Sequence, residues 1–377
     1  MRRLSLLLAA TLACAASPTL AEGWRIIGPG GGGSLFHPTV SPHDNRTALV
    51  ACDMTGAYLT HDGGATWRIF NLGEPVQFFV FDPIDANVIY ASGGGVFRSG
   101  DAGATWQRFF PRQVRRVTMG DDHASASLQT TGQPRGEVTA LGVDPADSHS
   151  LYLALGTALW TSSDVGATWQ KSADLPGPAR QIWIDPRSPR GDRTLYAAGP
   201  DSLYIRRQGR WRATRLPGTA TAISGAPPVF YATIAGKIHV STDDGVTWRD
   251  SPLPGFQGQA TAIAASPEHP EIAYVSYSGL RAPVRTTWGV AKTIDGGRHW
   301  EPVYNNVHDA WLSDRFGAGW AGNPIGLGVA PRDAGLVYAT DSGRVLRTND
   351  GGKTWNEAYS NRTPDGNCKL ACSPSVV

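Results

Sequence analysis

The chain has 377 residues and a formal net charge of +2, from 34 basic and 32 acidic side chains. This near balance gives no sign of nucleic acid or an anionic membrane as a partner, and no apolar run long enough to span a bilayer follows residue 21. The composition, with 45 glycines, 27 prolines, 13 tryptophans and only 18% charged residues, is typical of an all-β chain with many tight turns.

Residues 1–21 predict a cleavable secretory signal peptide. Two arginines precede the apolar run from Leu4 to Ala13, and small residues follow up to Ala21. Removing this segment takes away two basic and no acidic residues, so the mature chain has no net charge. We therefore expect a secreted or periplasmic protein. A lipid anchor is not expected, because the leucine before Cys14 lies one position late for a lipidation motif.

Three cysteines remain in the mature chain. Cys368 and Cys372 could form a small loop disulfide in an oxidising compartment, and Cys52 is expected to be a buried thiol. Their spacing matches no metal site, so the sequence predicts neither a metal nor a cofactor.

Six copies of one eight-residue turn divide the mature chain, and we call them the repeat turns. They share the skeleton Ser/Thr-x-Asp-x-Gly-x-Thr-Trp, broken only at His299, and resemble the Asp-box (BNR) repeat of β-propellers. They occupy residues 60–67, 99–106, 162–169, 241–248, 293–300 and 348–355. Six matches to one skeleton predict an architecture built from repeated units.

The residue types of the repeat turns indicate a structural role. In the first copy, the short carboxylate of Asp62 can accept hydrogen bonds from backbone N–H groups farther along the turn, while Gly64 can adopt the positive φ that closes it. The hydroxyls of Thr60 and Thr66 can tie the flanks together, and Trp67 can fill the space between neighbouring sheets. The aspartates of these turns are therefore not predicted to be catalytic.

The spacing of the repeat turns predicts seven blades. Successive aspartates lie 39 to 63 residues apart, except that 79 residues separate Asp164 from Asp243. Because a propeller unit takes about 40 to 50 residues, this gap should hold a degenerate blade that has lost its turn but kept Trp211. The prediction is a single seven-bladed β-propeller of four-stranded antiparallel blades over residues 22–360, followed by an irregular tail, 361–377. The blades are predicted at residues 29–73, 74–111, 112–176, 177–217, 218–256, 257–306 and 307–360.

The longest insertions should all lie on one face of this propeller. In a four-stranded blade, the link between the second and third strands shares a face with the link to the next blade, opposite the repeat turns. The insertions at residues 111–136, 277–290 and 304–323 occupy such links. Aromatic and charged residues in loops held by a rigid scaffold suit carbohydrate binding, although several of the tryptophans could simply pack the loops onto the sheets. The predicted substrate-binding residues are Tyr277, Arg281, Trp288, His308, Trp311 and Trp320.

Residues 49–67 (LVACDMTGAYLTHDGGATW), preceded by the glycine-rich segment 28–42, carry a more specific signal. Together they resemble the N-terminal propeller of glycoside hydrolase family 74, a xyloglucanase family, with Asp53–Tyr58 as the discriminating match. The resemblance implies that Asp53 is the general base of an inverting hydrolysis. The alternative is that Asp53 only caps its own turn before Gly56.

The same resemblance raises the question of a second carboxylate, since glycosidases use two. In the family, the general acid comes from a second propeller, which is expected to be absent from this chain. If the chain acts alone, Asp309, Asp314 or Asp121 would have to supply the acid. The expected partner is a polysaccharide or oligosaccharide of the β-glucan type.

Two functions therefore remain open at the level of the sequence. The first is a xyloglucanase- or β-glucanase-type hydrolase, or the N-terminal half of one. The second is a non-catalytic periplasmic or extracellular propeller that binds a glycan or protein, as an assembly factor does. Sialidase activity is disfavoured, because the Phe-Arg-Ile-Pro-type motif is missing.

Overall fold

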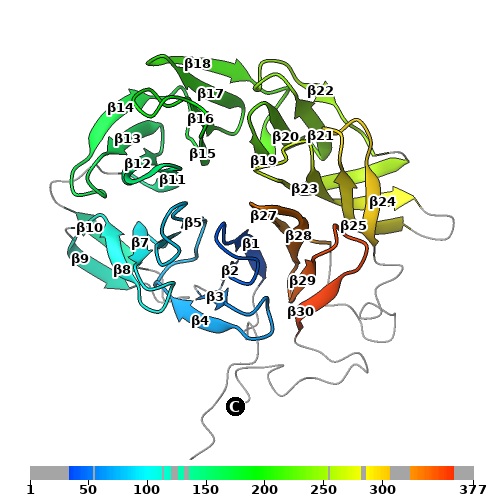
Figure 1. Ribbon diagram of the computed structural model, residues 1–377, viewed down its shortest axis with the longest axis horizontal. Helices are drawn as coiled ribbons and strands as arrows, with labels where there is room; N and C mark the ends of the chain where they lie inside the picture. The colour runs from blue at the N-terminus through cyan, green and yellow to red at the C-terminus, as the bar shows by residue number, and fades with distance from the viewer. Residues whose placement is uncertain are drawn as a thin grey trace, which may run out of the picture.

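The computed structural model describes residues 34–53, 56–112, 114–119, 126–130, 136–253, 255–281, 286–305 and 323–360. These residues form seven four-stranded antiparallel sheets arranged around a central axis (Figure 1), which confirms the predicted propeller. Each sheet pairs its strands in chain order, with the first strand nearest the axis. In the part of the chain described, no helix has the length and apolar character needed to cross a membrane.

In the first four blades the second and third strands are more buried than the fourth. Blade 1 contains β1 (Leu35–Val40), β2 (Ala48–Cys52), β3 (Gly56–Thr60) and β4 (Arg68–Asn71). Blade 2 contains β5 (Phe79–Phe81), β6 (Ile89–Ser92), β7 (Val96–Ser99) and β8 (Gln107–Phe110). Blade 3 contains β11 (Val138–Asp144), β12 (Asp147–Leu155), β13 (Ala158–Ser162) and β14 (Gln170–Asp174). Blade 4, the predicted degenerate blade, contains β15 (Gln181–Ile184), β16 (Leu195–Ala198), β17 (Ser202–Arg207) and β18 (Arg210–Arg215).

The last three blades complete the ring beside blade 1. Blade 5 contains β19 (Ala220–Ala226), β20 (Val229–Ile234), β21 (Lys237–Ser241) and β22 (Arg249–Asp250). Blade 6 contains β23 (Phe256–Ala265), β24 (Ala273–Arg281), β25 (Thr286–Thr293) and β26 (Glu301–Asn305). Blade 7 contains β27 (Gly326–Ala330), β28 (Asp333–Thr340), β29 (Arg344–Thr348) and β30 (Asn356–Ser360).

Two of the predicted insertions contain regular structure. Residues 114–119 and 126–130 pair as the antiparallel hairpin β9–β10 between blades 2 and 3. The segment 277–290, expected to be a loop, instead lengthens β24 and β25, which stay paired out to Arg281 and Thr286. A register shift between Ser278 and Leu280 lets this pairing continue. Blade 6 therefore extends beyond its neighbours as a long hairpin.

The repeat turns have the hydrogen bonds expected from their sequence. The Asp62 carboxylate accepts the amide N–H of Thr66 on Oδ1 (2.8 Å), its hydroxyl on Oδ2 (2.6 Å) and the hydroxyl of Thr60 on Oδ1 (2.8 Å). Gly64 has φ +93° and donates its N–H to the Thr60 hydroxyl. The other five copies repeat this pattern, with His299 taking the place of the second threonine in the fifth.

The hydrophobic core consists of seven buried clusters, one between each pair of adjacent blades. Between blades 1 and 7, for example, Trp67 is only 2% exposed and belongs to a cluster with Tyr338 and Val345. Within residues 34–360 as described, no strand is shared between these two blades, and they meet through packing and polar contacts such as the Leu35 N–H donating to the Asp341 carbonyl. Apolar burial of about 25 cal/mol per Å² therefore stabilises every blade interface, including the closing one.

The glycine that follows each repeat-turn aspartate by two residues also fits the turn against the preceding blade. A Cβ at Gly103 would lie only 2.5 Å from Leu59 of blade 1. The same close approach, at 2.3–2.7 Å, pairs Gly64 with Ala358, Gly166 with Phe109, Gly245 with Leu203, Gly297 with Val240 and Gly352 with Val303. The repeat turns thus dock six of the blades onto their neighbours.

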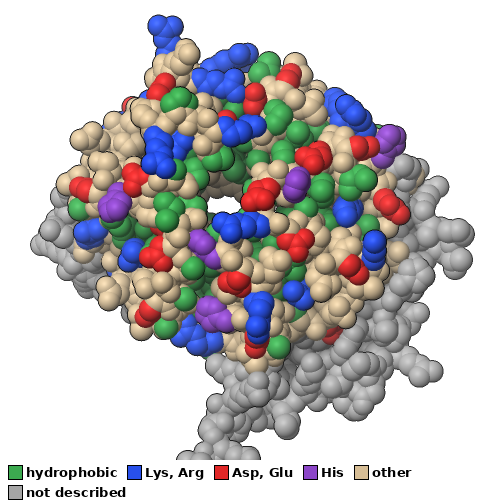
Figure 2. Space-filling model, viewed as in Figure 1, with side chains coloured by type: hydrophobic (Ala, Val, Ile, Leu, Met, Phe, Trp, Pro, Cys, Tyr) green, Lys and Arg blue, Asp and Glu red, His purple; other side chains and the backbone are tan. Residues whose placement is uncertain are grey.

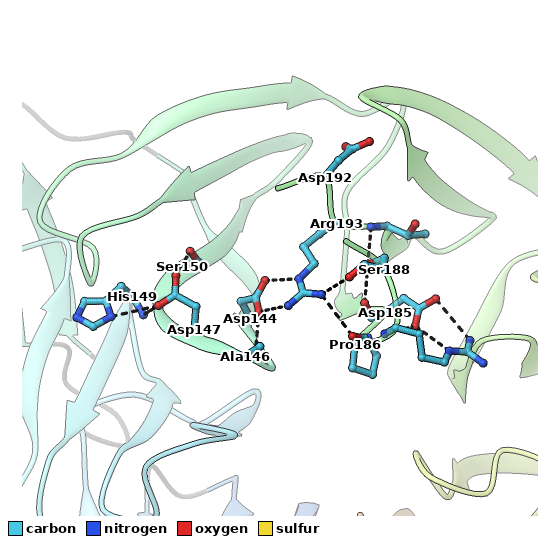
Figure 3. Close-up of polar contacts among 12 residues, drawn as sticks. Asp144, Ala146, Asp147, His149, Ser150, Asp185, Pro186, Ser188, Asp192 and Arg193 are labelled. Carbon is cyan, nitrogen blue, oxygen red and sulfur yellow. Dashed lines mark hydrogen bonds and ion pairs between the residues drawn. The ribbon is translucent and has the colours of Figure 1, made fainter. Parts of the chain in front are cut away.

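Blade 4 lacks this close glycine contact with the preceding blade and has a buried ion pair instead. Its corresponding turn, at Gln208 and Gly209, has positive φ at both residues, and a Cβ at Gly209 would meet nothing within 4 Å. Arg193, from the link between β15 and β16, instead reaches Asp144 of blade 3 (Figure 3). The guanidinium donates to both carboxylate oxygens, at 2.6 and 2.8 Å, and both side chains are at most 5% exposed.

Candidate functional site

Asp53 lies in the link between β2 and β3, on the face opposite the repeat turns, which we call the loop face. The preceding strand β2 is buried along its whole length, whereas the Asp53 side chain is exposed. The Asp53 N–H donates to the Ser34 carbonyl (3.3 Å), and the buried thiol of Cys52 lies 3.6 Å from Asp53 Oδ1. The chain thus holds an accessible carboxylate at the end of a rigid strand.

The corresponding link in blade 7, between β28 and β29, holds a second carboxylate, Asp341, which is buried. Asp341 accepts hydrogen bonds from Arg344 Nε (2.8 Å) and from the backbone N–H groups of Gly343 and Arg344, and both side chains are buried. Arg344 also lies 3.5 Å from Glu357 on β30. The Asp341 carbonyl accepts the N–H of Leu35, so this cluster ties blade 7 to blade 1. Its role is structural, while the exposed Asp53 is the carboxylate that could meet a solute.

Sequence reasoning missed the Asp341, Arg344 and Glu357 cluster. Its only trace in the sequence is the Asp-x-x-Arg spacing in the link before β29, which by itself resembles an ordinary turn. In the sequence, Glu357 is twelve or more residues away from both Asp341 and Arg344. It lies close to them only because β30 pairs with β29.

A cavity of about 680 Å³ occupies the ring centre, a size within the ~300–1,000 Å³ typical of ligand pockets. It is lined mainly by the first residues of the inner strands, which begin at the loop face, so the cavity lies toward the same face as Asp53. Aromatic groups such as Phe36 and Trp183 alternate there with polar ones such as Gln77, Glu137 and Arg180. Figure 2 shows an opening at the centre of the ring with both charge signs around it.

His37 lines this cavity and has positive φ (+51°). Desolvation by the surrounding protein lowers the pKa of its imidazole below the usual value. The ring is therefore neutral at pH 7 and can both donate and accept hydrogen bonds inside the cavity.

The predicted binding residues fall into three groups. Trp288 on β25 is partly buried, opposite Ser278. Tyr277 is 0% exposed and donates its hydroxyl to the Tyr304 carbonyl (3.2 Å), so it packs blade 6 rather than facing a solute. Arg281 lies at the tip of β24, where the structure describes only its backbone. The remaining predicted residues lie outside the described part of the chain: His308, Trp311, Trp320, Asp309, Asp314 and Asp121.

Among the described residues, no group of three or more His, Cys, Asp or Glu side chains is arranged to hold a metal ion. The described site comprises an exposed carboxylate, Asp53, and a polar and aromatic cavity that lies toward the same face.

The chain is similar to known proteins in both sequence and fold. No family model matches the chain. The sequence is 26% identical over 385 residues to xyloglucanase Xgh74A of Acetivibrio thermocellus, covering 89% of this chain and 39% of the relative. The solved GH74 xyloglucanase from Xanthomonas campestris superposes with a TM-score of 0.63 at 21% identity, covering 90% of this chain and 56% of that one. A structure of YCF48 bound to D1 peptide gives a TM-score of 0.56 at 14% identity, covering 86% of this chain and 96% of that one.

These comparisons confirm the predicted resemblance to GH74 xyloglucanases. The sequence match extends along nearly the whole propeller, while the chain spans only about two fifths of the curated relative's length. The two structural matches show the shared fold alone.

Proposed function

We propose that this propeller binds a polysaccharide of the xyloglucan or β-glucan class across its loop face and takes part in its hydrolysis, with Asp53 as the general base. The observation that carries the proposal is the 26% identity to a xyloglucanase along 89% of the chain. The exposure of Asp53 at the end of β2 supports it, because a general base must be reachable by water and substrate.

In the proposed reaction, Asp53 accepts a proton from a water molecule as that water attacks the anomeric carbon from the face opposite the leaving group. A second carboxyl group protonates the departing glycosidic oxygen, and in inverting enzymes the two groups stand about 6.5–9.5 Å apart. Asp309, Asp314 and Asp121 are the candidates for this acid within the chain, and a second propeller is the candidate outside it. Secretion through residues 1–21 would bring the protein to its polymer.

The central cavity, which lies toward the same face as Asp53, supplies the second element of the proposal. Aromatic rings next to hydrogen-bonding groups match the alternation of apolar faces and hydroxyl edges on a sugar chain. Phe36, Trp183 and Gln77 provide such groups at the ring centre. Trp288, a partly buried aromatic residue on the long hairpin of blade 6, is a further candidate.

The experiment is a reducing-end assay of the purified full chain on xyloglucan, mixed-linkage β-glucan and an unrelated α-glucan. The proposal predicts release of reducing ends from at least one β-glucan and none from the α-glucan, with loss of the activity in Asp53→Asn. Equal release by wild type and Asp53→Asn would remove Asp53 from the reaction. Asp309→Asn, Asp314→Asn and Asp121→Asn, assayed in parallel, would identify an acid within the chain.

A second candidate function is binding without turnover. Its specific support is that YCF48, a propeller whose chain is matched over 96% of its length, carries a bound peptide, whereas the xyloglucanase relatives extend far beyond the matched region. This function predicts retention of the full chain in affinity electrophoresis through a glycan gel, or binding of a peptide, without product formation. Weaker retention of Trp288→Ala or Trp311→Ala would favour the glycan.

A further inference from the structure

Blade 4 is strongly basic although the chain as a whole is nearly neutral. Residues 181–215 contain eight arginines and three aspartates, with no lysine or glutamate. This is the blade that has lost its repeat turn: Gln208 stands where the other blades have the turn's aspartate, and Arg206 and Arg207 directly precede it at the end of β17. The excess positive charge is therefore concentrated where one repeat feature is missing.

A small pocket lies where this basic blade meets blade 3, and we call it the basic pocket. Its volume is about 240 Å³, below the ~300–1,000 Å³ of pockets for larger ligands. Arg190, Arg193 and Arg206 line it from blade 4, and hydroxyl-bearing residues including Tyr152 and Ser163 line it from blade 3. Thr168 also lines it, but its hydroxyl donates to Asp164 of the repeat turn (2.6 Å). No carboxylate is among the described residues that line it. The size and the donors suit a small anionic group.

The three guanidinium groups differ in how much of their charge is already compensated. Arg193 is fully engaged with Asp144 and with the carbonyls of Pro186 and Ser188 (Figure 3). One amino group of Arg206 donates to Asp192 (3.1 Å) and to the Arg193 carbonyl (3.0 Å), which orients the rest of that guanidinium. The two aspartates thus balance two of the three arginines.

Arg190 supplies the uncompensated charge. Within the described residues it makes no ion pair or side-chain hydrogen bond, and it is exposed at the pocket rim. Its loop is nevertheless held in place, because the Ser188 hydroxyl donates to the Asp185 carbonyl (2.6 Å) and the Asp192 N–H donates to the Pro189 carbonyl (3.0 Å). Because the loop is fixed, only the Arg190 side chain itself has to be ordered on binding.

We propose that the basic pocket binds a tetrahedral oxyanion, phosphate or sulfate, either free or as an ester on a larger molecule, through Arg190 and Arg206. Guanidinium groups bind such oxygens with paired, charge-assisted hydrogen bonds. Donors converge here from two blades, which matches a group whose oxygens point in several directions. Burial raises the pKa of the Tyr152 hydroxyl, so it remains a donor at neutral pH. The pocket lies on the repeat-turn face, so this proposal is independent of Asp53.

The test is isothermal titration calorimetry of the full chain with sodium phosphate, sodium sulfate and sodium chloride at constant ionic strength. We expect saturable binding of phosphate or sulfate and none of chloride. Arg190→Gln should weaken binding about ten-fold or more, because it removes charge-assisted hydrogen bonds. The matched control is Arg212→Gln, an exposed arginine on β18 of the same blade outside the pocket, which should bind as wild type does.

Equal weakening by Arg190→Gln and Arg212→Gln would show a diffuse charge effect and overturn the proposal, as would the absence of binding by wild type. Thermal unfolding of Arg190→Gln should match wild type, since this side chain has no partner to lose among the described residues. A sugar phosphate used in place of inorganic phosphate separates the two sources. If the sugar phosphate binds more tightly than inorganic phosphate, and Arg190→Gln weakens this binding, the natural ligand is a phosphate ester on a larger molecule. If the two bind equally, the natural ligand is a free ion.

Discussion

Arg193 and Asp144 show at the residue scale how the chain adapts to a lost repeat. Because both side chains are at most 5% exposed, each charge depends on the other for the interactions that water would otherwise supply. The sequence predicted a blade without its turn, but it did not predict this pair. The two residues are 49 positions apart, and only the packing of blade 4 on blade 3 brings them together.

Arg193→Met tests this pairing. The substitution leaves Asp144 buried without its counter-charge, and we expect the free energy of unfolding to fall by about 3–5 kcal/mol. Arg187→Met is the matched control, because Arg187 pairs with Asp185 from the same loop but its side chain is 65% exposed, and its loss should cost about 0–1 kcal/mol. Urea unfolding followed by tryptophan fluorescence measures both, and similar losses would argue against a special role for the buried pair.

The repeat-turn aspartates make a second residue-scale prediction, which concerns pH. Hydrogen bonds from the Thr105 hydroxyl and N–H lower the pKa of Asp101 to about 2, and the corresponding threonines do the same for Asp164 and Asp350. Since the folded pKa lies below the unfolded one, this stabilisation is present above about pH 4 and is lost as the pH falls towards 2.

The measurement is the thermal unfolding midpoint of wild type and Asp101→Asn across this range. The variant should unfold at a lower temperature at pH 7, and its midpoint should decline less steeply between about pH 4 and pH 2. Parallel declines in the two proteins would show that Asp101 does not contribute to the acid sensitivity.

At the element scale, each repeat turn has two structural roles: it closes its own hairpin and it packs against the preceding blade. Only the first role could be predicted from the sequence. The turn's hydrogen bonds could be predicted from Thr60, Asp62 and Thr66, because all of these contacts are local. Its second role, docking onto the preceding blade through a glycine, depends on a residue far away in the sequence, such as Leu59, which lies 44 positions before Gly103. The extension of β24 and β25 was missed for a related reason, since cross-strand pairing rather than local residue type decides where a hairpin ends.

Alanine substitutions at two glycines distinguish the cost of the turn's backbone conformation from the cost of disturbing its contact with the preceding blade. Gly103 and Gly209 both have positive φ, +84° and +71°, but a Cβ would clash with Leu59 only at Gly103. Gly209→Ala should therefore cost only the backbone term of about 1–2 kcal/mol. Gly103→Ala should cost a further ~1–3 kcal/mol for overpacking the blade interface. Chemical denaturation compares them, and equal costs would mean that the turn does not depend on this close approach.

At the scale of the whole molecule, the two proposed sites lie on opposite faces of the propeller. The repeat turns and the basic pocket lie on one face, while Asp53 and the central cavity lie on the other. Fold class and blade number could be predicted, because the repeated motif marks six of the seven blades. That the loop face carries the function stays a prediction. The surroundings of Asp53 could not be predicted, because the Asp341 cluster and the cavity are assembled from several blades.

The most direct test of the central proposal is the hydrolysis of a β-glucan by wild type, Asp53→Asn and Asp201→Asn, with polymer binding measured for each. Asp201 is an exposed carboxylate in the corresponding link of blade 4, so it controls for general loss of charge on the loop face. We predict that Asp53→Asn lowers kcat/KM about 10²- to 10⁴-fold while polymer affinity stays close to wild type, and that Asp201→Asn changes neither. Unchanged hydrolysis by Asp53→Asn, or an equal loss in both variants, would contradict the proposed role of Asp53.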